Sequence, residues 1–500
     1  MIRFLFSLSL LLMVSACQQS IPEQNEIRIG LAQTPMTLDP RYATDAASHR
    51  VQELLHRGLI RLDGHFEPQP DAAEYWEHPN PLTWRFFLRT NLKFHDGTPV
   101  RAADVAATLN SILDAEMASP LRAGFAAIRS VKAVSERELI IHLSKPDASL
   151  LTRLSIGIIP APLAARGQQA RTIIGCGPCH LVSWDQHGLL LEQSDAHGPV
   201  RRLRFITVKD PVTRSLKMAR GELDFTENDL PPHLLPYLRR QKQLKIVSLP
   251  STTFSYIGLN LHDPILKHVR VRHALALSLD RVRLKKALFS GLPELAEAVL
   301  SPMHWAAAQL PATAFSPVTA EHLLDQAGYP RKADGIRFTL NYRTSTDPGR
   351  LSLATAIASM WHNIGVDVHI ESLEWGGFYA RIKRGDFQVY SLSWVGIVDP
   401  DIYRWILHSD MWPPKGANRG RYSNPQVDAW LDAASQTENR EERRHLYGLI
   451  EKQMAADQVY IPLWYEPVIA VSGPRISGFT PAPDGSLLGL LDVKMKAVVN

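Results

Sequence analysis

The stretch LTWRFFLRTNLKFHDGTPVRAADVAATLNSIL, residues 82–113, is the most informative part of this 500-residue chain. Along residues 84–88 every second side chain is large and apolar, which is close to the period of a half-buried strand. Residues 95–97, His-Asp-Gly, are a turn signal, because glycine tolerates positive φ and aspartate bonds to its own backbone. Along residues 105–113 the apolar side chains recur at helical spacing. The stretch therefore predicts a strand, a turn and a helix.

The composition is that of a globular protein with room for two large lobes. Hydrophobic residues make up 45% and charged residues 21% of the chain, and its net charge is +5. The basic side chains form no long run, so nucleic-acid binding is not expected. Beyond the N-terminus no segment has about 18 consecutive apolar residues, the length that spans a bilayer. The mature body is therefore expected to be soluble.

The N-terminal sequence MIRFLFSLSLLLMVSAC reads as a secretory signal. Its last four residues, Val-Ser-Ala-Cys, resemble a bacterial lipobox, in which the cysteine is lipidated and becomes the first residue after cleavage. We therefore expect a signal peptide over residues 1–16, lipidation of Cys17 and a lipid-anchored tether over residues 17–26. Each buried methylene of an acyl chain contributes about 0.8 kcal/mol, so several chains would hold the protein at a membrane. The alternative is an ordinary signal peptide with an incidental cysteine.

Several motifs together resemble one protein family. They are KFHDG at residues 93–97, GELD at 221–224, VRVRHALALSLDR at 269–281 and YSNPQVD at 422–428. By these motifs the chain is similar to the family 5 extracellular solute-binding proteins, which are periplasmic receptors of peptide, nickel and related ABC importers. The resemblance covers nearly the whole mature chain.

This resemblance implies an α/β fold of the periplasmic-binding-protein type. Two lobes are joined by a hinge, mixed sheets are flanked by helices, and lobe one carries an extra subdomain. Lobe one is expected over residues 27–265, with the subdomain at about 63–165, and lobe two over residues 266–472. The C-terminal residues 473–500 are expected to return to lobe one.

Local patterns refine this layout. A strand–helix–strand pattern over residues 338–370 predicts parallel pairing in lobe two, with a loop over residues 343–349. Apolar residues on one side predict a helix over residues 50–62. Strands near residues 256–260 and 470–473 connect the two expected lobes and imply a hinge.

A receptor of this kind needs a few fixed polar groups and aromatic walls rather than catalytic groups. Trp394 ends a predicted strand of lobe two, and its counterpart in the family lines the ligand cleft; the alternative is a tryptophan of the core. The resemblance also brings the loop that begins at residue 33 to the cleft. Thr34 and Met36 in that loop, and Tyr256 on its strand, are therefore further candidates for ligand binding.

Two positions bear on the choice of ligand. In dipeptide-binding relatives an aspartate just after the Trp-x-Gly pairs with the ligand amine, whereas this chain has Ile397 there. Asp399 could replace it, although Asp399-Pro400 also matches a structural Asp-Pro of the family. A free α-amine is therefore not expected to be strongly preferred unless Asp399 or another acid compensates. Arg350 lies near the place of a carboxylate-binding arginine, whose planar fork suits that group; the alternative is an exposed loop arginine.

The segment Cys176-Gly177-Pro178-Cys179-His180 contains two patterns of other chemistry. Cys-x-x-Cys-His is the attachment pattern of c-type haem, and Cys-Gly-Pro-Cys occurs in thioredoxins. Family members have Gly-Thr-Gly-Pro-Tyr at this place, so the cysteines replace two residues of a structural turn. A local disulfide between Cys176 and Cys179, or a pair of buried thiols, is therefore favoured over haem attachment and over redox activity.

The remaining residues suggest no catalysis. The 19 histidines show no clear metal spacing, and hydrolase and nucleotide-binding motifs are missing. We expect no enzymatic activity and no cofactor. The predicted function is capture of a peptide or similar small solute by a monomeric, lipid-anchored periplasmic receptor, which delivers it to the permease of an ABC importer. A nickel or metal-chelate receptor of the same fold is the first alternative, and a periplasmic c-type haem or redox protein is the second.

Overall fold

The computed structural model describes residues 25–167, 173–186, 188–194, 200–228, 230 and 234–496. The expected signal peptide, the lipidation site Cys17 and most of the expected tether lie outside these residues. Within the described ranges no helix is both long enough and apolar enough to cross a membrane.

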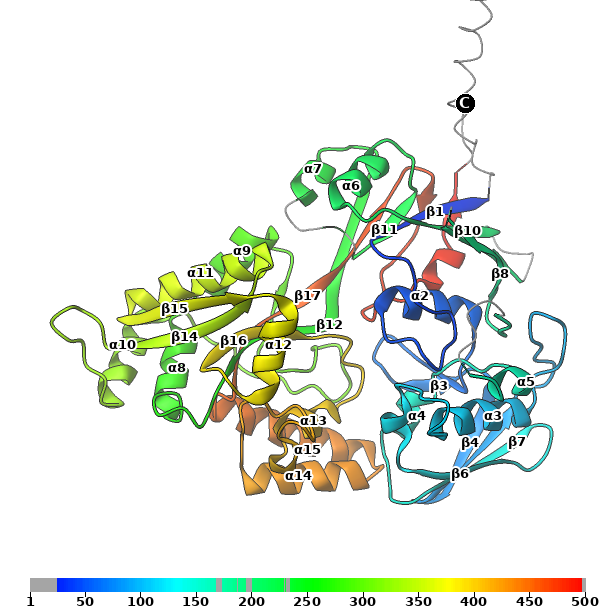
Figure 1. The fold of residues 1–500 in the computed structure, drawn as a ribbon, viewed down its shortest axis with the longest axis horizontal. Helices are drawn as coiled ribbons and strands as arrows, with labels where there is room; N and C mark the ends of the chain where they lie inside the picture. The colour runs from blue at the N-terminus through cyan, green and yellow to red at the C-terminus, as the bar shows by residue number, and fades with distance from the viewer. Residues whose placement is uncertain are drawn as a thin grey trace, which may run out of the picture.

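One mixed sheet runs through the described part of the chain (Figure 1). Its strand order is β15-β14-β16-β12-β17-β11-β1-β10-β9-β8, with β13 attached to β17. β14 pairs in parallel with β15 and β16, which confirms the parallel pairing predicted for residues 338–370. The strands are β1 (Glu26–Leu31), β8 (Cys179–Asp185), β9 (Gly188–Gln193), β10 (Arg202–Thr207), β11 (Phe225–Glu227), β12 (Lys245–Leu259), β13 (Glu294–Leu295), β14 (Phe338–Ser345), β15 (Val366–Leu373), β16 (Val389–Trp394) and β17 (Tyr460–Ser472).

The two ends of this sheet have separate hydrophobic cores, and we call the parts around them lobe one (β1 and β8–β11) and lobe two (β14–β16). In lobe two, α8–α11 cover one face of the sheet and α12–α15 cover the other. The helices of lobe one are α2 (Ala46–Leu55), α6 (Pro211–Ala219) and α7 (Leu235–Arg239). Those of lobe two are α8 (Val269–Leu277), α9 (Arg281–Phe289), α10 (Pro317–Gln326), α11 (Pro348–Asn363), α12 (Trp375–Arg384), α13 (Ile402–Leu407), α14 (Pro425–Gln436) and α15 (Arg440–Ala456).

Residues 82–113 form part of an added layer, which lies below α2 in Figure 1. Trp84, Phe86 and Leu88 are buried, while the residues between them are only partly covered. Gly97 in the turn has a φ of 86°, and the Asp104 carboxylate accepts a backbone N–H at the start of α3. The predicted strand, turn and helix are confirmed. The layer consists of the antiparallel strands β4 (Ala73–Asn80), β5 (Thr83–Leu88), β6 (Ile128–Ala133) and β7 (Glu138–Leu143), with α3 (Ala102–Leu113), α4 (Leu150–Arg153) and α5 (Ala161–Ala164).

The helix predicted over residues 50–62 is wrong in its second half. α2 ends at Leu55, and the next residue, His56, is extended, with φ −128° and ψ 151°. Residues 60–62 form the short strand β2 (Ile60–Leu62), which pairs with β3 (Pro68–Pro70). Cross-strand pairing at the entry to the added layer thus overrides the helical spacing, because the same apolar residues can be buried in either conformation.

Two smaller boundaries also differ from the expectation. The loop expected over residues 343–349 is shorter, because β14 continues to Ser345 and α11 begins at Pro348. Glu26, expected at the end of the tether, is the first residue of β1. Its carboxylate is buried and pairs with Arg204 of the neighbouring strand β10, with 2.7 Å between Oε1 and Nε. An ion pair thus fixes the first strand from its first residue.

β12 and β17 are the long strands that link the two lobes (Figure 1). They pair antiparallel, but the register is interrupted between Pro250↔Pro467 and Phe254↔Tyr465. Proline lacks the N–H of a ladder bond, and an irregular register lets a strand bend and twist. The interruption therefore divides the two strands into a lobe-one part and a lobe-two part.

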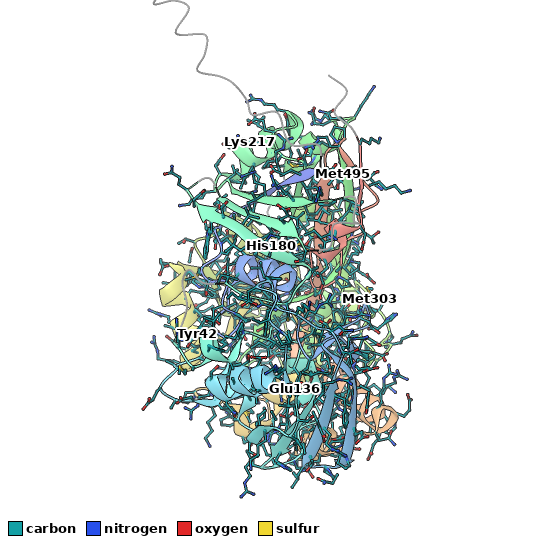
Figure 2. The ribbon with its side chains drawn as sticks, turned by 90° about the vertical axis from the view of Figure 1, so that its right-hand side faces the viewer. Tyr42, Glu136, His180, Lys217, Met303 and Met495 are labelled. Atoms are coloured by element: carbon teal, nitrogen blue, oxygen red, sulfur yellow. The ribbon has the colours of Figure 1, made fainter. Side chains whose placement is uncertain are left out.

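The segment after β17 packs against lobe one. Leu487, Leu490 and Val493 lie in the same core as the apolar residues of β1 and α2. Figure 2 shows this side of the molecule, with Met495 of the C-terminal segment towards one end and Glu136 of the added layer towards the other.

Candidate functional site

The site begins at the C-terminal end of β16, where Trp394 is the last residue of the strand. Its ring is partly exposed and lies parallel to the ring of Tyr256 on the neighbouring strand β12, with 6.1 Å between centroids and 8° between planes. Tyr256 is fully buried. Two of the predicted ligand-binding residues are therefore in contact, one as an accessible wall and the other as its support.

Arg419 completes this wall, although the sequence analysis did not single it out. Its guanidinium lies 4.4 Å from the centroid of the Trp394 ring. It donates hydrogen bonds to the hydroxyls of Tyr256, at 3.1 Å, and Tyr379, at 3.2 Å. Its residue is 7% exposed, and within the described residues it makes no ion pair with a carboxylate. A buried guanidinium of this kind can bind the carboxylate of a ligand by donating hydrogen bonds to it.

The loop before α14 holds Arg419 in place. The side-chain amide of Asn418 donates to the carbonyls of Leu407 and Tyr422, at 2.9 Å and 2.8 Å. Asn424 caps α14 by accepting the backbone N–H groups of the first turn. The position of Arg419 three residues before the YSNPQVD motif was therefore the only hint that the sequence offered. Its tyrosine partners on β12 and α12 are distant in sequence and could not be predicted.

Arg350 belongs to the same surface. It lies in the first turn of α11, and its guanidinium is 5.5 Å from the centroid of the Trp375 ring. Trp375 is 48% exposed and stacks on Tyr379, at 5.7 Å and 6°. A second arginine without a carboxylate partner in the described residues thus extends the wall. We call this set the cleft row: Arg350, Trp375, Tyr379, Arg419, Trp394 and Tyr256.

The two candidates of the first loop lie in lobe one. The Thr34 hydroxyl is 2.9 Å from the hydroxyl of Thr207, the last residue of β10. Met36 is 80% exposed, and its backbone N–H donates to the Ser48 hydroxyl at 2.9 Å. In the described residues no hydrogen bond or ring contact joins Thr34 or Met36 to the cleft row. The structure therefore places them as an accessible edge of the other lobe.

Asp399 has a different environment from the cleft row. Its Oδ1 accepts the Ser149 hydroxyl, at 2.7 Å, and the backbone N–H of Asp401, at 2.8 Å. Ser149 belongs to the added layer, so this carboxylate joins the two lobes. Ile397 is buried and its N–H donates to the carbonyl of Thr252. The geometry favours the structural interpretation of Asp399 over a role in binding a ligand amine.

Further contacts between the added layer and lobe two surround Asp399. Arg443 of α15 donates to the Ala148 carbonyl, at 3.4 Å, and His78 of β4 pairs with Glu438. Burial lowers the pKa of His78 and raises that of Glu438. The rings of Phe66 and His304 stack at 5.7 Å. The lobes therefore already touch on this side.

The disulfide between Cys176 and Cys179 is not formed, and the two cysteines are the pair of buried thiols. They face different cores: Cys176 packs in the added layer and Cys179 in the core of β1. Burial raises the pKa of Cys176 to about 11 and that of Cys179 to about 12. A thiol of that kind is unreactive, and two thiols that face separate cores cannot hold one haem. The haem and redox interpretations therefore do not fit.

The structure offers no resident metal centre within the residues it describes. No group of three or more His, Cys, Asp or Glu side chains there is arranged to hold an ion. What the cleft row can do chemically is to bind an apolar or aromatic group against Trp394 and Trp375 and an anionic group at the arginines.

Two lobes joined by a pair of long strands, with aromatic and charged side chains at the ends of the sheet strands, define a two-lobe binding protein of the periplasmic type. The family model of the bacterial extracellular solute-binding proteins, family 5 (middle part), matches residues 67–411. The chain belongs to this family.

Similar proteins agree with this assignment. The chain is 26% identical to the periplasmic oligopeptide-binding protein OppA of Salmonella typhimurium, over 89% of this chain and 88% of that protein. It is 27% identical to the glutathione-binding protein GsiB of Escherichia coli K12, over 90% of each. The structure of NikZ from Campylobacter jejuni in complex with Ni(L-His) matches with a TM-score of 0.77, at 24% identity, over 95% of this chain and 100% of that one. The predicted family, the two-lobe α/β fold and the role of a solute-binding protein for an ABC importer are confirmed.

Proposed function

We propose that the protein captures a peptide or a similar small solute between its lobes and delivers it to the permease of an ABC importer, without enzymatic activity of its own. The observation that carries this proposal is the cleft row, in which two arginines lie against accessible tryptophan rings without a carboxylate partner in the described residues. A peptide supplies both the apolar side chains and the terminal carboxylate that such a surface binds.

The proposed ligand site takes residues from both lobes. Trp394 supplies the main wall, supported by Tyr256, and Arg350 with Arg419 receives the anionic group. Thr34 and Met36 supply the opposite edge from lobe one.

The proposed domain layout follows the sequence: lobe one over residues 27–265 with the added layer at about 63–165, lobe two over 266–472, and the C-terminal return over 473–500. Within these bounds β12 and β17 each cross from one lobe to the other at their interrupted register. Closure would take place at the interrupted register of β12 and β17, as in proteins that move by a few hinge residues.

For localisation we propose a periplasmic monomer, anchored by lipid on Cys17. The relative OppA is named as periplasmic, and the lipobox-like residues before Cys17 support the anchor. A Cys17→Ser variant should be released from the membrane fraction, because no acyl chain can be attached to it. Membrane association unchanged by that substitution would contradict the anchor and leave the binding function standing.

A receptor for nickel or another metal chelate is the second candidate function. The arginines of the cleft row favour it as well, because a chelate with free carboxylates is anionic. Most of the metal ligands would belong to the chelate itself, so the protein would need to supply few metal-ligating side chains.

Native mass spectrometry of the purified protein, followed by calorimetry with the ligand found, tests both functions. A bound mass that fragments into amino acids supports the peptide receptor, and a metal isotope pattern supports the chelate receptor. If small-angle scattering shows no compaction when either ligand binds tightly, capture between closing lobes is wrong.

A further inference from the structure

Glu466 is a carboxylate at the place where β17 passes from lobe two to lobe one. It follows Tyr465 directly and lies at the interrupted register between β12 and β17. Two serines of neighbouring strands hold one of its oxygens: Oε1 accepts the hydroxyl of Ser255, at 2.6 Å, and of Ser393, at 2.7 Å. Ser393 is next to Trp394, so the carboxylate is fixed beside the end of β16.

Among the residues that the structure describes, this carboxylate has no cationic partner. Within the described residues no lysine, arginine or histidine lies within ion-pair distance of Glu466, and its second oxygen, Oε2, accepts no hydrogen bond. The side chain is nevertheless partly buried. A partly desolvated carboxylate is costly unless a positive charge is supplied. Two neutral serines fix its position but do not compensate its charge.

Two other partly buried acids of lobe two pair with arginines. Glu297 pairs with Arg281, at 2.6 Å, and Glu371 pairs with Arg343, at 2.7 Å. Glu466 differs from these two acids, because within the described residues it has serine partners at Oε1 and no cation. A cation supplied by a ligand would complete it.

We propose that Glu466 binds the free ammonium group of the cargo, and so determines specificity for ligands with an amine. The inference rests on the proposed peptide function. Glu466 would thus be the acid that is missing at Ile397, although it comes from a different strand. Asp399 is not available for this role, because it accepts the Ser149 hydroxyl of the added layer.

Glu466 of β17 and Arg350 of α11 then both contact residues of β16. Ser393 contacts Glu466, and the carbonyl of Ser391 accepts from Arg350 at 3.4 Å. These two serines are separated by about 7 Å along β16, since a strand rises about 3.3 Å per residue. A ligand that carries both an ammonium and a carboxylate would therefore be bound in one direction, with the ammonium towards the hinge.

Glu466→Gln tests this directly, because glutamine keeps an oxygen that can accept both serine hydroxyls and removes only the charge. Glu294→Gln is the matched control, since Glu294 is exposed and pairs with Tyr465 on the adjacent strand. The probes are a mixed pool of tri- to pentapeptides and the same pool N-acetylated. Retention by the immobilised, ligand-stripped protein is measured by mass spectrometry, and thermal unfolding checks that each variant is folded.

We expect the native protein and Glu294→Gln to retain free peptides at least about tenfold better than acetylated ones, a difference of about 1.4 kcal/mol. Glu466→Gln should retain the two pools to within about twofold. A Glu466→Gln variant that keeps the native preference overturns the inference, and so does a native protein that retains both pools equally. Retention of neither pool by the native protein would instead overturn the peptide function itself.

Discussion

Trp394 and Asp399 are close in sequence, but the charges around them are arranged in opposite ways. Around Asp399 each acid has a partner from the fold: Ser149 donates to Asp399, and the Tyr447 hydroxyl donates to Asp401 at 2.5 Å. Around Trp394 the guanidinium of Arg419 lies on aromatic rings, with tyrosine hydroxyls as its acceptors. A buried charge costs several kcal/mol unless it is paired. In the first region the acids bridge elements of the two lobes, whereas in the second region the guanidinium lies against an accessible ring, where the proposed function places a ligand.

The largest effect on stability is expected at Glu451, a fully buried acid that belongs to neither region. Burial raises its pKa to about 8, although the Tyr403 hydroxyl and the N–H of Ala308 donate hydrogen bonds to it. The folded state therefore binds the proton more tightly than the unfolded state. The resulting stability is fully present below about pH 4.5 and falls as the pH rises towards 8, by up to about 1.4 kcal/mol per pH unit. Urea denaturation at pH 5 and pH 8 measures this slope.

Glu451→Gln should flatten that pH dependence, because glutamine cannot ionise, whereas Glu294→Gln on the surface should leave it unchanged. If the native protein and Glu451→Gln show the same slope, Glu451 is ionised in the folded protein, and lobe two tolerates a buried charge without a cation. The contrast between the paired and unpaired regions would then lose its physical basis.

Trp394→Ala sharpens the comparison at the unpaired region. Loss of this accessible aromatic wall should weaken binding of the co-purified ligand by about 2 kcal/mol, or roughly thirtyfold. Calorimetry measures the loss, and unchanged thermal unfolding shows that the fold persists. Trp405→Ala is the control, since Trp405 is 45% exposed on α13. Equal losses in the two variants would mean that Trp394 acts through lobe two as a whole.

Arg419→Lys should have a smaller and more selective effect. Lysine keeps the charge but loses the planar fork that bonds Tyr256 and Tyr379 together. Binding of a peptide with a free C-terminal carboxylate should weaken by about tenfold, or about 1.4 kcal/mol, while binding of its amidated form should change little. Calorimetry on the matched pair of peptides measures this. A similar loss for both forms would assign Arg419 to support of Trp394 rather than to the ligand.

Ser149→Ala acts on the paired region and should have the smallest effect. Removing the hydroxyl that Asp399 accepts should cost about 1 kcal/mol of the contact between the lobes and shift the protein towards an open form. The radius of gyration in small-angle scattering should rise at limiting ligand and return to the native value at saturation. Ser155→Ala is the control, because the Ser155 hydroxyl bonds only within its own turn. No difference between the two variants would show that Asp399 does not hold the lobes together.

The motifs that identified the family turn out to be largely structural. In YSNPQVD, Asn424 caps α14, the Tyr422 hydroxyl donates to Asp457 at 2.5 Å, and Asp428 accepts the Ser409 hydroxyl at 2.6 Å. Such contacts depend on residues that are near in sequence or on fixed elements, so a short motif can reveal them. The family could therefore be predicted from the sequence, while the ligand could not.

Local sequence patterns left two features undecided for the same physical reason. The helix expected over residues 50–62 came from a local pattern, and so did the disulfide that was one of the two alternatives for Cys176 and Cys179; the other alternative, buried thiols, is the one observed. Tertiary packing decided otherwise: residues 60–62 pair as a strand, and the two thiols face different cores. Gly177 between the cysteines lies so close to Leu55 that a Cβ there would meet its backbone at 2.4 Å. The turn is shaped by this close approach to α2, not by a bond between sulfurs.

The sequence by itself determined the family, the two-lobe α/β fold, the strand–turn–helix of residues 82–113 and the place of Trp394, because these depend on periodicity, turn residues and motifs along the chain. Only the tertiary structure decided which charges are free. Arg419 meets Tyr256 and Tyr379, and Glu466 meets Ser255 and Ser393, across separations in sequence that no pattern encodes. By sequence alone, Asp399 could have bound a ligand amine. In the fold its carboxylate accepts the hydroxyl of Ser149 from the other lobe.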